Sequence, residues 1–151
     1  MRIVADTNIL VSGLLWRGLP WQLMRLAEAK RVELCMTPPM FTELAEVLAY
    51  RRMQPRLRQL GLTAGEIVAF AVSLTSVFET AEGEPIVTAD PDDDIFLRCA
   101  AAAGAAYVVS GDRHLLELGT YAAIPIVTVH DFFAKEFPHQ LETASDVSSA
   151  V

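Results

Sequence analysis

The sequence predicts a three-layer α/β/α domain whose central sheet is mainly parallel. Short apolar stretches typical of buried strands alternate along the chain with longer segments of helical periodicity. This alternation indicates right-handed crossovers between parallel strands, with helices on both faces of the sheet. The length of 151 residues and the hydrophobic content of 52% suit one domain with its own core. We expect that domain to cover residues 1–137, followed by a flexible polar tail over residues 138–151.

The expected strands are short, apolar and rich in β-branched residues. They cover residues 2–5, 32–36, 107–110 and 126–129, with a weaker candidate at residues 86–88. The expected helices carry apolar residues three and four positions apart and cover residues 9–15, 20–30, 37–48, 63–77, 93–103, 113–118 and 130–137. Thr63 and Glu66 form a capping box for one of them. Residues 51–61 and 81–91 are expected to be a turn region and a loop.

Charge is unevenly distributed along the chain. The net charge is −7, yet residues 1–60 carry nine Lys or Arg and five Asp or Glu, a balance of +4, which leaves −11 for residues 61–151. Basic residues gather at Arg51, Arg52, Arg56 and Arg58. Such a cluster could contact phosphates, or could equally form the solvated end of a helix.

Neither a membrane span nor a signal peptide is expected. The longest apolar stretches are too short to cross a bilayer, and the first one contains Asp6 and Asn8. Cys35 and Cys99 lie far apart within apolar patterns and lack the spacing of metal ligands, which favours two buried, reduced thiols. We therefore expect a cytoplasmic protein that does not bind a membrane.

Two aspartates directly follow predicted strands. Asp6 comes after the strand at residues 2–5, and Asp112 comes two residues after the strand at residues 107–110. Parallel sheets of this class bind ligands beyond the carboxyl ends of their strands, so both carboxylates should lie at one edge. Each could instead serve only as the cap of the helix that follows it.

The run Asp90-Pro91-Asp92-Asp93-Asp94 is the most unusual local feature. A helix N-terminus favours one or two acids, but four carboxylates in five positions repel one another, so a bound cation is the better explanation. On a helix of about 100° per residue, Asp93 lies in the middle of the apolar stripe formed by Phe96, Leu97 and Ala100. Asp93 is therefore expected to face the sheet edge, with Asp94 as the reserve candidate. Asp92 and Asp94 are expected to serve as cap and solvated charge.

Several further polar residues are candidates for the same site. Glu43 borders the apolar stripe of its predicted helix, although an ordinary exposed glutamate would show the same pattern. Ser110 could bond a phosphate, a metal-bound water or only the backbone. We assign the substrate contacts to Asn8, Ser110, Arg51 and Arg52.

Clustered carboxylates suit a hard divalent cation. Mg²⁺ and Mn²⁺ prefer oxygen ligands, and Mg²⁺ usually binds one or two carboxylates together with waters and substrate phosphate. Such an ion activates a water and stabilises negative charge on phosphate without any nucleophilic side chain. The sequence contains no zinc-type histidine spacing, phosphate-binding loop or nucleophile elbow.

Four segments in order resemble the motifs of the PIN domain family. They are residues 4–10 (VADTNIL), Glu43 within residues 39–48, residues 90–97 (DPDDDIFL) and residues 110–116 (SGDRHLL), where the family more often has Thr in place of Ser110. The resemblance extends over about residues 2–135. It implies a PIN-like fold and a site of Asp6, Glu43, Asp93 and Asp112 that cleaves RNA with Mg²⁺ or Mn²⁺.

Within this family, the segments resemble those of the VapC-like toxin ribonucleases of toxin–antitoxin systems. This similarity implies an RNA substrate, a small protein antitoxin and a homodimer. Two other readings remain: a PIN-like module that binds RNA or protein without cleaving, and a Mg²⁺-dependent phosphatase of the haloacid dehalogenase type. The phosphatase chemistry uses two aspartates spaced D-x-D after the first strand, and here the second position is Asn8.

Overall fold

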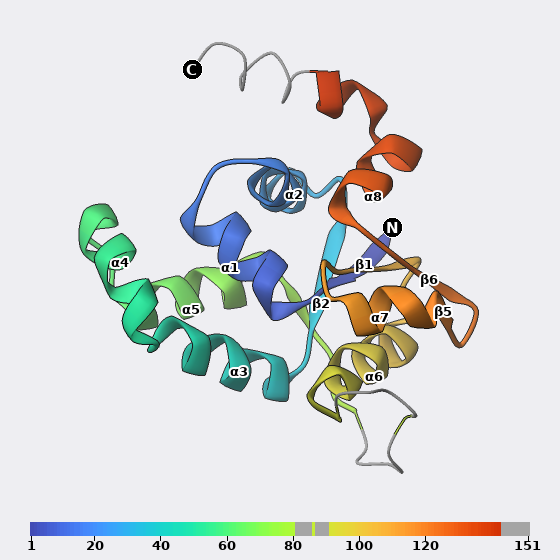
Figure 1. Ribbon diagram of the computed structural model, residues 1–151, viewed down its shortest axis with the longest axis horizontal. Coiled ribbons are helices and arrows are strands. Elements are labelled where there is room, and N and C mark those ends of the chain that lie inside the picture. The colour runs from blue at the N-terminus through green and yellow to red at the C-terminus, as the bar shows by residue number, and fades with distance from the viewer. Residues whose placement is uncertain (81–85, 87–90, 143–151) are drawn as a thin grey trace.

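The computed structural model describes residues 1–80, 86 and 91–142 (Figure 1). Its sheet has six strands in the order β3-β2-β1-β4-β6-β5, and all neighbouring pairs are parallel except β5 with β6. The strands are β1 (Arg2–Ala5), β2 (Glu33–Met36), β3 (Ser76–Val77), β4 (Tyr107–Val109), β5 (Thr120–Tyr121) and β6 (Ile124–Val127). The predicted, mainly parallel sheet is thus confirmed.

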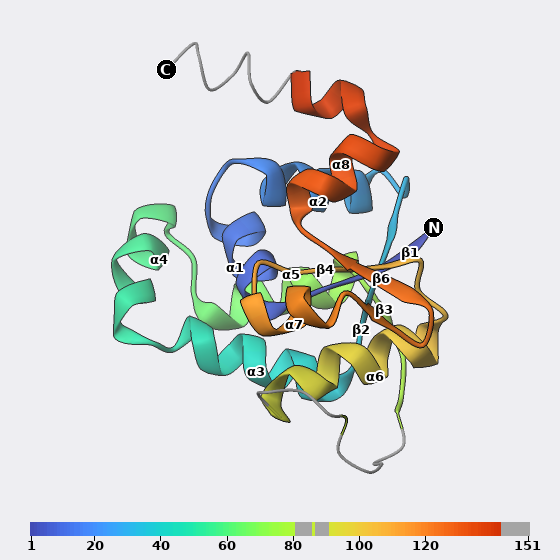
Figure 2. The ribbon, with the colours of Figure 1, turned by 45° about the vertical axis from the view of Figure 1, so that its right-hand side comes forward.

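Helices lie on both sides of this sheet, as the predicted three-layer class requires. Figure 2 shows α3 and α6 on one side and α2 and α8 on the other. The helices are α1 (Thr7–Leu15), α2 (Leu19–Glu28), α3 (Pro38–Leu48), α4 (Gln54–Leu60), α5 (Ala64–Leu74), α6 (Asp94–Ala103), α7 (Arg113–Leu118) and α8 (Val129–Glu136), with short 3₁₀ turns at Arg51–Met53 and Pro91–Asp93.

Three sequence predictions about these elements were wrong. The expected turn region at residues 51–61 contains a 3₁₀ turn and α4, which ends at Gly61 in the left-handed conformation (φ 66°). The expected helix over residues 63–77 ends at Leu74, and Ser76–Val77 pairs with β2 as β3. The last strand begins at Ile124, after the unpredicted hairpin strand β5. Weak periodicity explains the first error, because Leu57 is the sole buried residue of α4.

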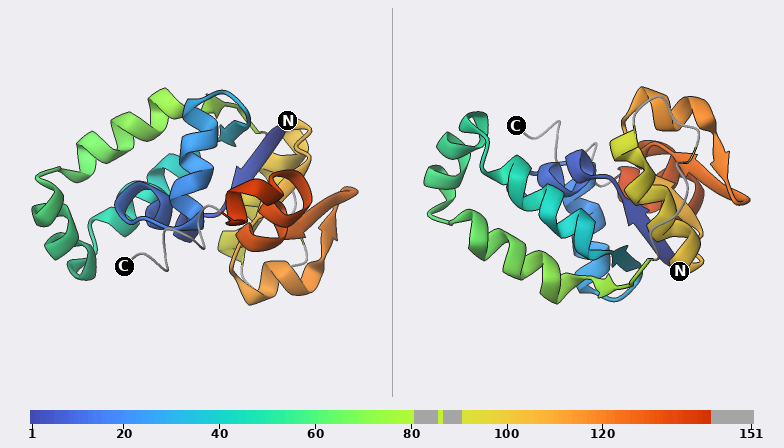
Figure 3. Two further views of the ribbon diagram at one scale, coloured as in Figure 1. Left: turned by 90° about the horizontal axis from the view of Figure 1, so that it is seen from above. Right: turned by 90° about the horizontal axis from the view of Figure 1, so that it is seen from below.

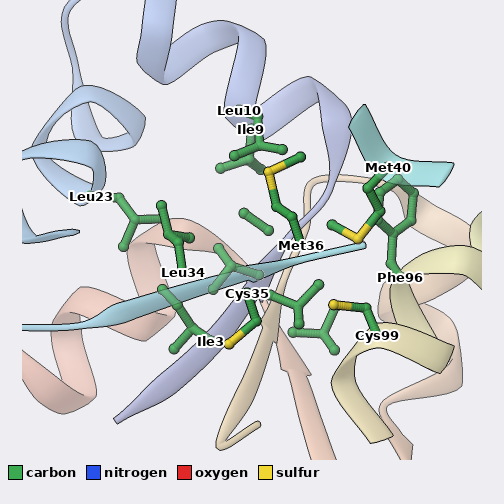
Figure 4. Packing of buried hydrophobic residues seen from close by; sticks show 14 of the residues in the cluster. Ile3, Ile9, Leu10, Leu23, Leu34, Cys35, Met36, Met40, Phe96 and Cys99 are labelled. Carbon is green, nitrogen blue, oxygen red and sulfur yellow. The ribbon is translucent and has the colours of Figure 1, made fainter. Parts of the chain in front are cut away.

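The core is built around β1 and β2, whose side chains alternate between the two faces of the sheet. In Figure 4, Leu34 and Met36 point toward α1 and Leu23, whereas Cys35 points to the face on which α6 carries Cys99. Both cysteines are buried free thiols, as expected. Burial raises the pKa of the Cys35 thiol to about 11 and that of Cys99 to about 12, so both stay protonated.

Two expectations concern segments that the structure describes only in part. Of the candidate strand at residues 86–88, Ile86 is described and belongs to no strand, and the other two residues lie outside the described part. Residues 138–142, expected to begin an unpatterned tail, are helical, and Leu141 packs against the core. No single helix among the described residues is long and apolar enough to span a membrane. The helical segments Arg51–Leu60 and Ala64–Leu74, which are bent by 78° relative to each other, together have the length and composition of a span.

Candidate active site

The two central strands end side by side at the carboxyl edge of the sheet. Ala5 of β1 is opposite Val109 of β4, so the next residues, Asp6 and Ser110, lie at the same level. The amide of Asp6 donates to the carbonyl of Val109 at 3.1 Å, which continues the ladder by one residue. The strand-end argument from sequence therefore located this edge correctly.

Asp6 is buried, with 4% of its surface exposed. Its Oδ1 accepts a hydrogen bond of 2.9 Å from the amide of Ile9, which makes Asp6 the N-cap of α1. Its Oδ2 accepts a hydrogen bond from the hydroxyl of Ser110. Asp6 is thus both a helix cap and a carboxylate held at the sheet edge, and the two roles that the sequence left open are compatible.

Ser110 joins Asp6 to Asp112. The same Ser110 Oγ that donates to Asp6 accepts a hydrogen bond of 2.9 Å from the amide of Asp112. Asp112 in turn caps α7, since its Oδ1 accepts from the amides of His114 and Leu115 at 2.9 and 3.2 Å. Ser110 is fully buried, and its hydroxyl holds the carboxylate of Asp6 and the backbone amide of Asp112 at this edge.

Thr7, the residue after Asp6, bonds a carboxylate of another helix. Its hydroxyl donates to Oε2 of Glu43 at 2.8 Å and thereby links the start of α1 to the middle of α3. Thr7 is 4% exposed and Glu43 is half-buried. Sequence reasoning missed Thr7, because its neighbours in the run Asp6-Thr7-Asn8 offered equally polar side chains and nothing local indicates which one meets α3.

Burial and mutual repulsion raise the proton affinity of two of these acids. The pKa of Asp6 is raised above its ordinary value, chiefly by burial and further by the charge of Asp112, against the opposing hydrogen bonds from Ser110 and Ile9. The pKa of Glu43 is raised as well, first by burial and then by the charges of Asp92 and Asp6, while the Thr7 hydrogen bond opposes the shift. Carboxylates from four separate segments of the chain therefore act on one another at this edge.

The acidic run before α6 divides into three different environments. Asp92 is exposed, as expected, yet its charge acts on Glu43, so the prediction that it serves only as cap or solvated charge was incomplete. Asp93 is 8% exposed and is the N-cap residue of α6. The expectation that Asp94 serves as cap or solvated charge was wrong, because Asp94 is 6% exposed and the N-cap residue is Asp93; the Oδ2 of Asp94 accepts from the amide of Ile86 at 3.0 Å. Asp90 lies outside the described residues.

Carboxylate oxygens are the donors that Mg²⁺ and Mn²⁺ prefer, and the site holds them in pairs. Asp6 interacts with Asp112 and with Glu43, but within the described residues no three acid, histidine or cysteine side chains form a group that could hold an ion by themselves. A pair suffices where waters and a substrate phosphate complete the shell. The donor set thus fits a weakly held ion better than a permanent one.

The remaining substrate candidates lie at different distances from the acids. Asn8 is exposed on the first turn of α1, next to Thr7. Arg51 and Arg52 are exposed in the 3₁₀ turn beyond the end of α3, away from the carboxyl edge. A cleft of about 780 Å³, lined in part by Glu33, Phe70 and Ser76, opens at the opposite, amino edge of the sheet and contains none of the candidate acids.

A comparison with protein families found a match over most of the chain. Residues 2–114 match the protein family described as PIN domain. The matched segment makes up more than half of the chain and includes Asp6, Glu43, Asp93 and Asp112. A search of the curated proteins found no match.

Proposed function

Because the chain belongs to the PIN domain family, whose members are generally nucleases, we propose that it is an endoribonuclease that depends on Mg²⁺ or Mn²⁺. We further propose that it is the VapC-like toxin of a toxin–antitoxin pair, restrained by a small protein antitoxin, and that it works as a cytoplasmic homodimer. The resemblance of its four acidic segments to those of the family supports this finer assignment.

One observation carries the proposal. Two buried hydroxyl-bearing residues bring three acidic residues from distant parts of the chain together: Ser110 bonds the Asp6 carboxylate and the backbone amide of Asp112, and Thr7, the neighbour of Asp6, bonds the Glu43 carboxylate. The pKa values of Asp6 and Glu43 are both raised, chiefly by burial and further by the charges of neighbouring acids, so this arrangement weakens the fold unless a bound cation compensates the charge. Such an arrangement is typical of a functional site.

The residues of the chain have distinct expected roles. Asp6 and Asp112 would hold the ion, together with Glu43 and Asp93; when bound, that ion supplies an activated water and stabilises charge on the scissile phosphate. Ser110 keeps the Asp6 carboxylate in a fixed orientation. Glu43, half-buried and with a raised pKa, suits the acceptance of a proton from the attacking water.

The test compares RNA cleavage by the wild-type protein with cleavage by Asp6→Asn and Asp112→Asn. We expect cleavage of a single-stranded RNA with Mg²⁺ or Mn²⁺, none after EDTA, and a loss of at least about 100-fold in each variant. Asp131→Asn, an exposed acid in the first turn of α8, is the matched control and should cleave normally. Cleavage that persists in EDTA, or in both site variants, would refute the proposal.

The alternative of a binding module without catalysis has one observation in its favour, the lack among the described residues of a three-ligand group. Such a module would bind RNA with equal affinity in EDTA and in Mg²⁺, and would leave it uncut at every metal concentration. Calorimetric titration of Mn²⁺ into the wild-type protein distinguishes the two functions, since the nuclease predicts heat of binding that Asp6→Asn abolishes.

A further inference from the structure

Two large aromatic side chains are exposed next to arginines at one end of the molecule. Trp16, which follows α1, is 41% exposed, and Tyr50, which follows α3, is 48% exposed. The guanidinium of Arg56 lies 5.7 Å from the centre of the Trp16 ring, and that of Arg52 lies 5.3 Å from the centre of the Tyr50 ring. Trp16, Tyr50, Arg51, Arg52 and Arg56 are called the aromatic–arginine patch below.

The patch is one surface, although its residues come from different elements. Arg56 of α4 donates from Nε to the carbonyl of Leu15 at 2.7 Å, which ties α4 to the end of α1. Tyr50 and the two arginines after it form the short connection from α3 to α4. Both views of Figure 3 show α4 at the end of the molecule, with α3 leading to it.

The patch is positive in a chain that is negative overall. Residues 49–62 contain four arginines and no Asp or Glu, whereas the whole chain has a net charge of −7. In the part of the chain that the structure describes, Arg51, Arg52 and Arg56 take part in no salt bridge. A symmetric contact with a second copy through this patch would place arginines against arginines, which disfavours a dimer interface here.

Two helices connect the patch with the candidate active site. α1 begins beside Asp6 and ends at Leu15, directly before Trp16, and α3 begins at the carboxyl edge, carries Glu43 and ends before Tyr50. At 1.5 Å per residue, the nine steps from Thr7 to Trp16 span about 14 Å. A strand of a few nucleotides covers that distance, so one RNA can reach both places.

We propose that the aromatic–arginine patch binds the single-stranded RNA substrate by stacking bases on Trp16 and Tyr50. Exposed aromatic rings beside guanidinium groups are the usual platform for unpaired bases, and arginines outside salt bridges neutralise the phosphates. This inference rests on the proposed ribonuclease function and adds to it a place where the RNA chain is held. Trp16, Tyr50 and their arginines are positioning residues and do not touch the reacting phosphate.

The test measures binding without cleavage. A 12-nucleotide single-stranded RNA with a fluorescent label is titrated with protein in EDTA, and its dissociation constant is read from anisotropy. Because one stacked base contributes about 1–3 kcal/mol, Trp16→Ala should weaken binding about 5- to 150-fold, and Trp16→Phe should restore most of the affinity. In a Trp21→Phe background Trp16 is the one remaining tryptophan, and RNA should quench its fluorescence.

The charge component has its own variant and a matched control. Arg51→Ala combined with Arg52→Ala should reduce the dependence of log affinity on log salt by about 1.4, since each phosphate of a single strand that is no longer neutralised accounts for about 0.7. Arg31→Ala is the control. Arg31 also lies over an aromatic ring, that of Phe137 at 5.0 Å, but it is outside the patch, in the connection between α2 and β2. Its affinity should equal that of the wild-type protein, and thermal melting of every variant verifies folding.

The outcomes separate this inference from the proposed function. If Trp16→Ala and the double arginine variant bind RNA as the wild type does while metal-dependent cleavage is present, the patch proposal is overturned and the nuclease stands. If Trp16→Ala instead changes the oligomeric state in sedimentation without changing RNA affinity, the patch is a protein interface and the proposal also fails. Weaker binding with an unchanged cleavage pattern at saturating RNA supports it.

Discussion

The hydrogen bond from Thr7 to Glu43 offers the sharpest test of the site. Thr7→Val keeps the shape of the buried side chain and removes its hydroxyl, which donates to Oε2 of Glu43 at 2.8 Å. That bond stabilises the ionised carboxylate against burial and against the charges of Asp92 and Asp6. Without it, the pKa of Glu43 rises further.

The size of the effect follows from the nature of this bond. A hydrogen bond to a charged group contributes about 1.5–3 kcal/mol, and the half-buried position of Glu43 argues for the lower limit. At about 1.4 kcal/mol per tenfold change, the ratio of ionised to protonated Glu43 at a given pH should fall about tenfold. The acid limb of the pH–rate profile for RNA cleavage should move to higher pH accordingly.

The free energy of unfolding should also reflect the higher pKa of Glu43 in Thr7→Val. A carboxyl group whose pKa is raised in the folded state contributes stability below its unfolded pKa, and that contribution is lost as pH rises through the folded pKa. Thr7→Val raises the folded pKa of Glu43 further. The difference in unfolding free energy between wild type and variant should therefore grow from pH 4 toward neutral pH.

The assay follows the side-chain carboxyl of Glu43 by carbon NMR in the metal-free protein, together with the pH–rate profile. Thr7→Ser keeps the donor and is the matched control, so its titration should follow that of the wild type. An unchanged Glu43 titration in Thr7→Val, or an equal shift in Thr7→Ser, would show that the hydroxyl does not act on this carboxylate.

Two further predictions concern the scaffold that holds the site. Leu97 of α6 is fully buried against the sheet, so Leu97→Ala should cost about 2–5 kcal/mol and Leu97→Met under about 1.5 kcal/mol in chemical unfolding; equal losses would contradict the packing. Thr63 accepts from the amide of Glu66 at 3.1 Å in the capping box of α5, so Thr63→Ala should cost about 1 kcal/mol, or about 2–4 °C in melting temperature. Thr63→Ser should melt like the wild type, and a similar drop in both variants would argue against the cap.

Local patterns predicted the acids at the strand ends but not the groups that orient them. Asp6 and Asp112 followed apolar strands, and parallel strands bring their carboxyl ends to one edge. Thr7 had no comparable signal, and Ser110 was equally suited to the backbone, a phosphate or a metal-bound water. The assignment of Asp93 to the ion came from helical phase and family resemblance and stays a prediction, since the described electrostatic effects on Glu43 come from Asp92, Asp6 and Glu46.

The α4 region shows a different limit. Pro55 in the first turn and Gly61 at the end are ordinary helix boundaries, yet the segment between them has little apolar periodicity. The helix is stabilised instead by contacts such as that of Arg56 with the carbonyl of Leu15, 41 residues away. The arginine cluster was visible in the sequence, but its exposed aromatic neighbours became visible only once α1 and α3 were seen to end beside it.

The alternation of strands and helices and the placement of acids after strands depend on local composition, and the sequence by itself determined them. Only the tertiary structure decided which polar side chains meet, because Ser110 and Asp6 are 104 residues apart and Thr7 and Glu43 are 36 apart. Such pairs depend on the order of strands in the sheet and on the rotation of each helix about its axis. Both are set by packing of the whole core, which no short window of residues contains.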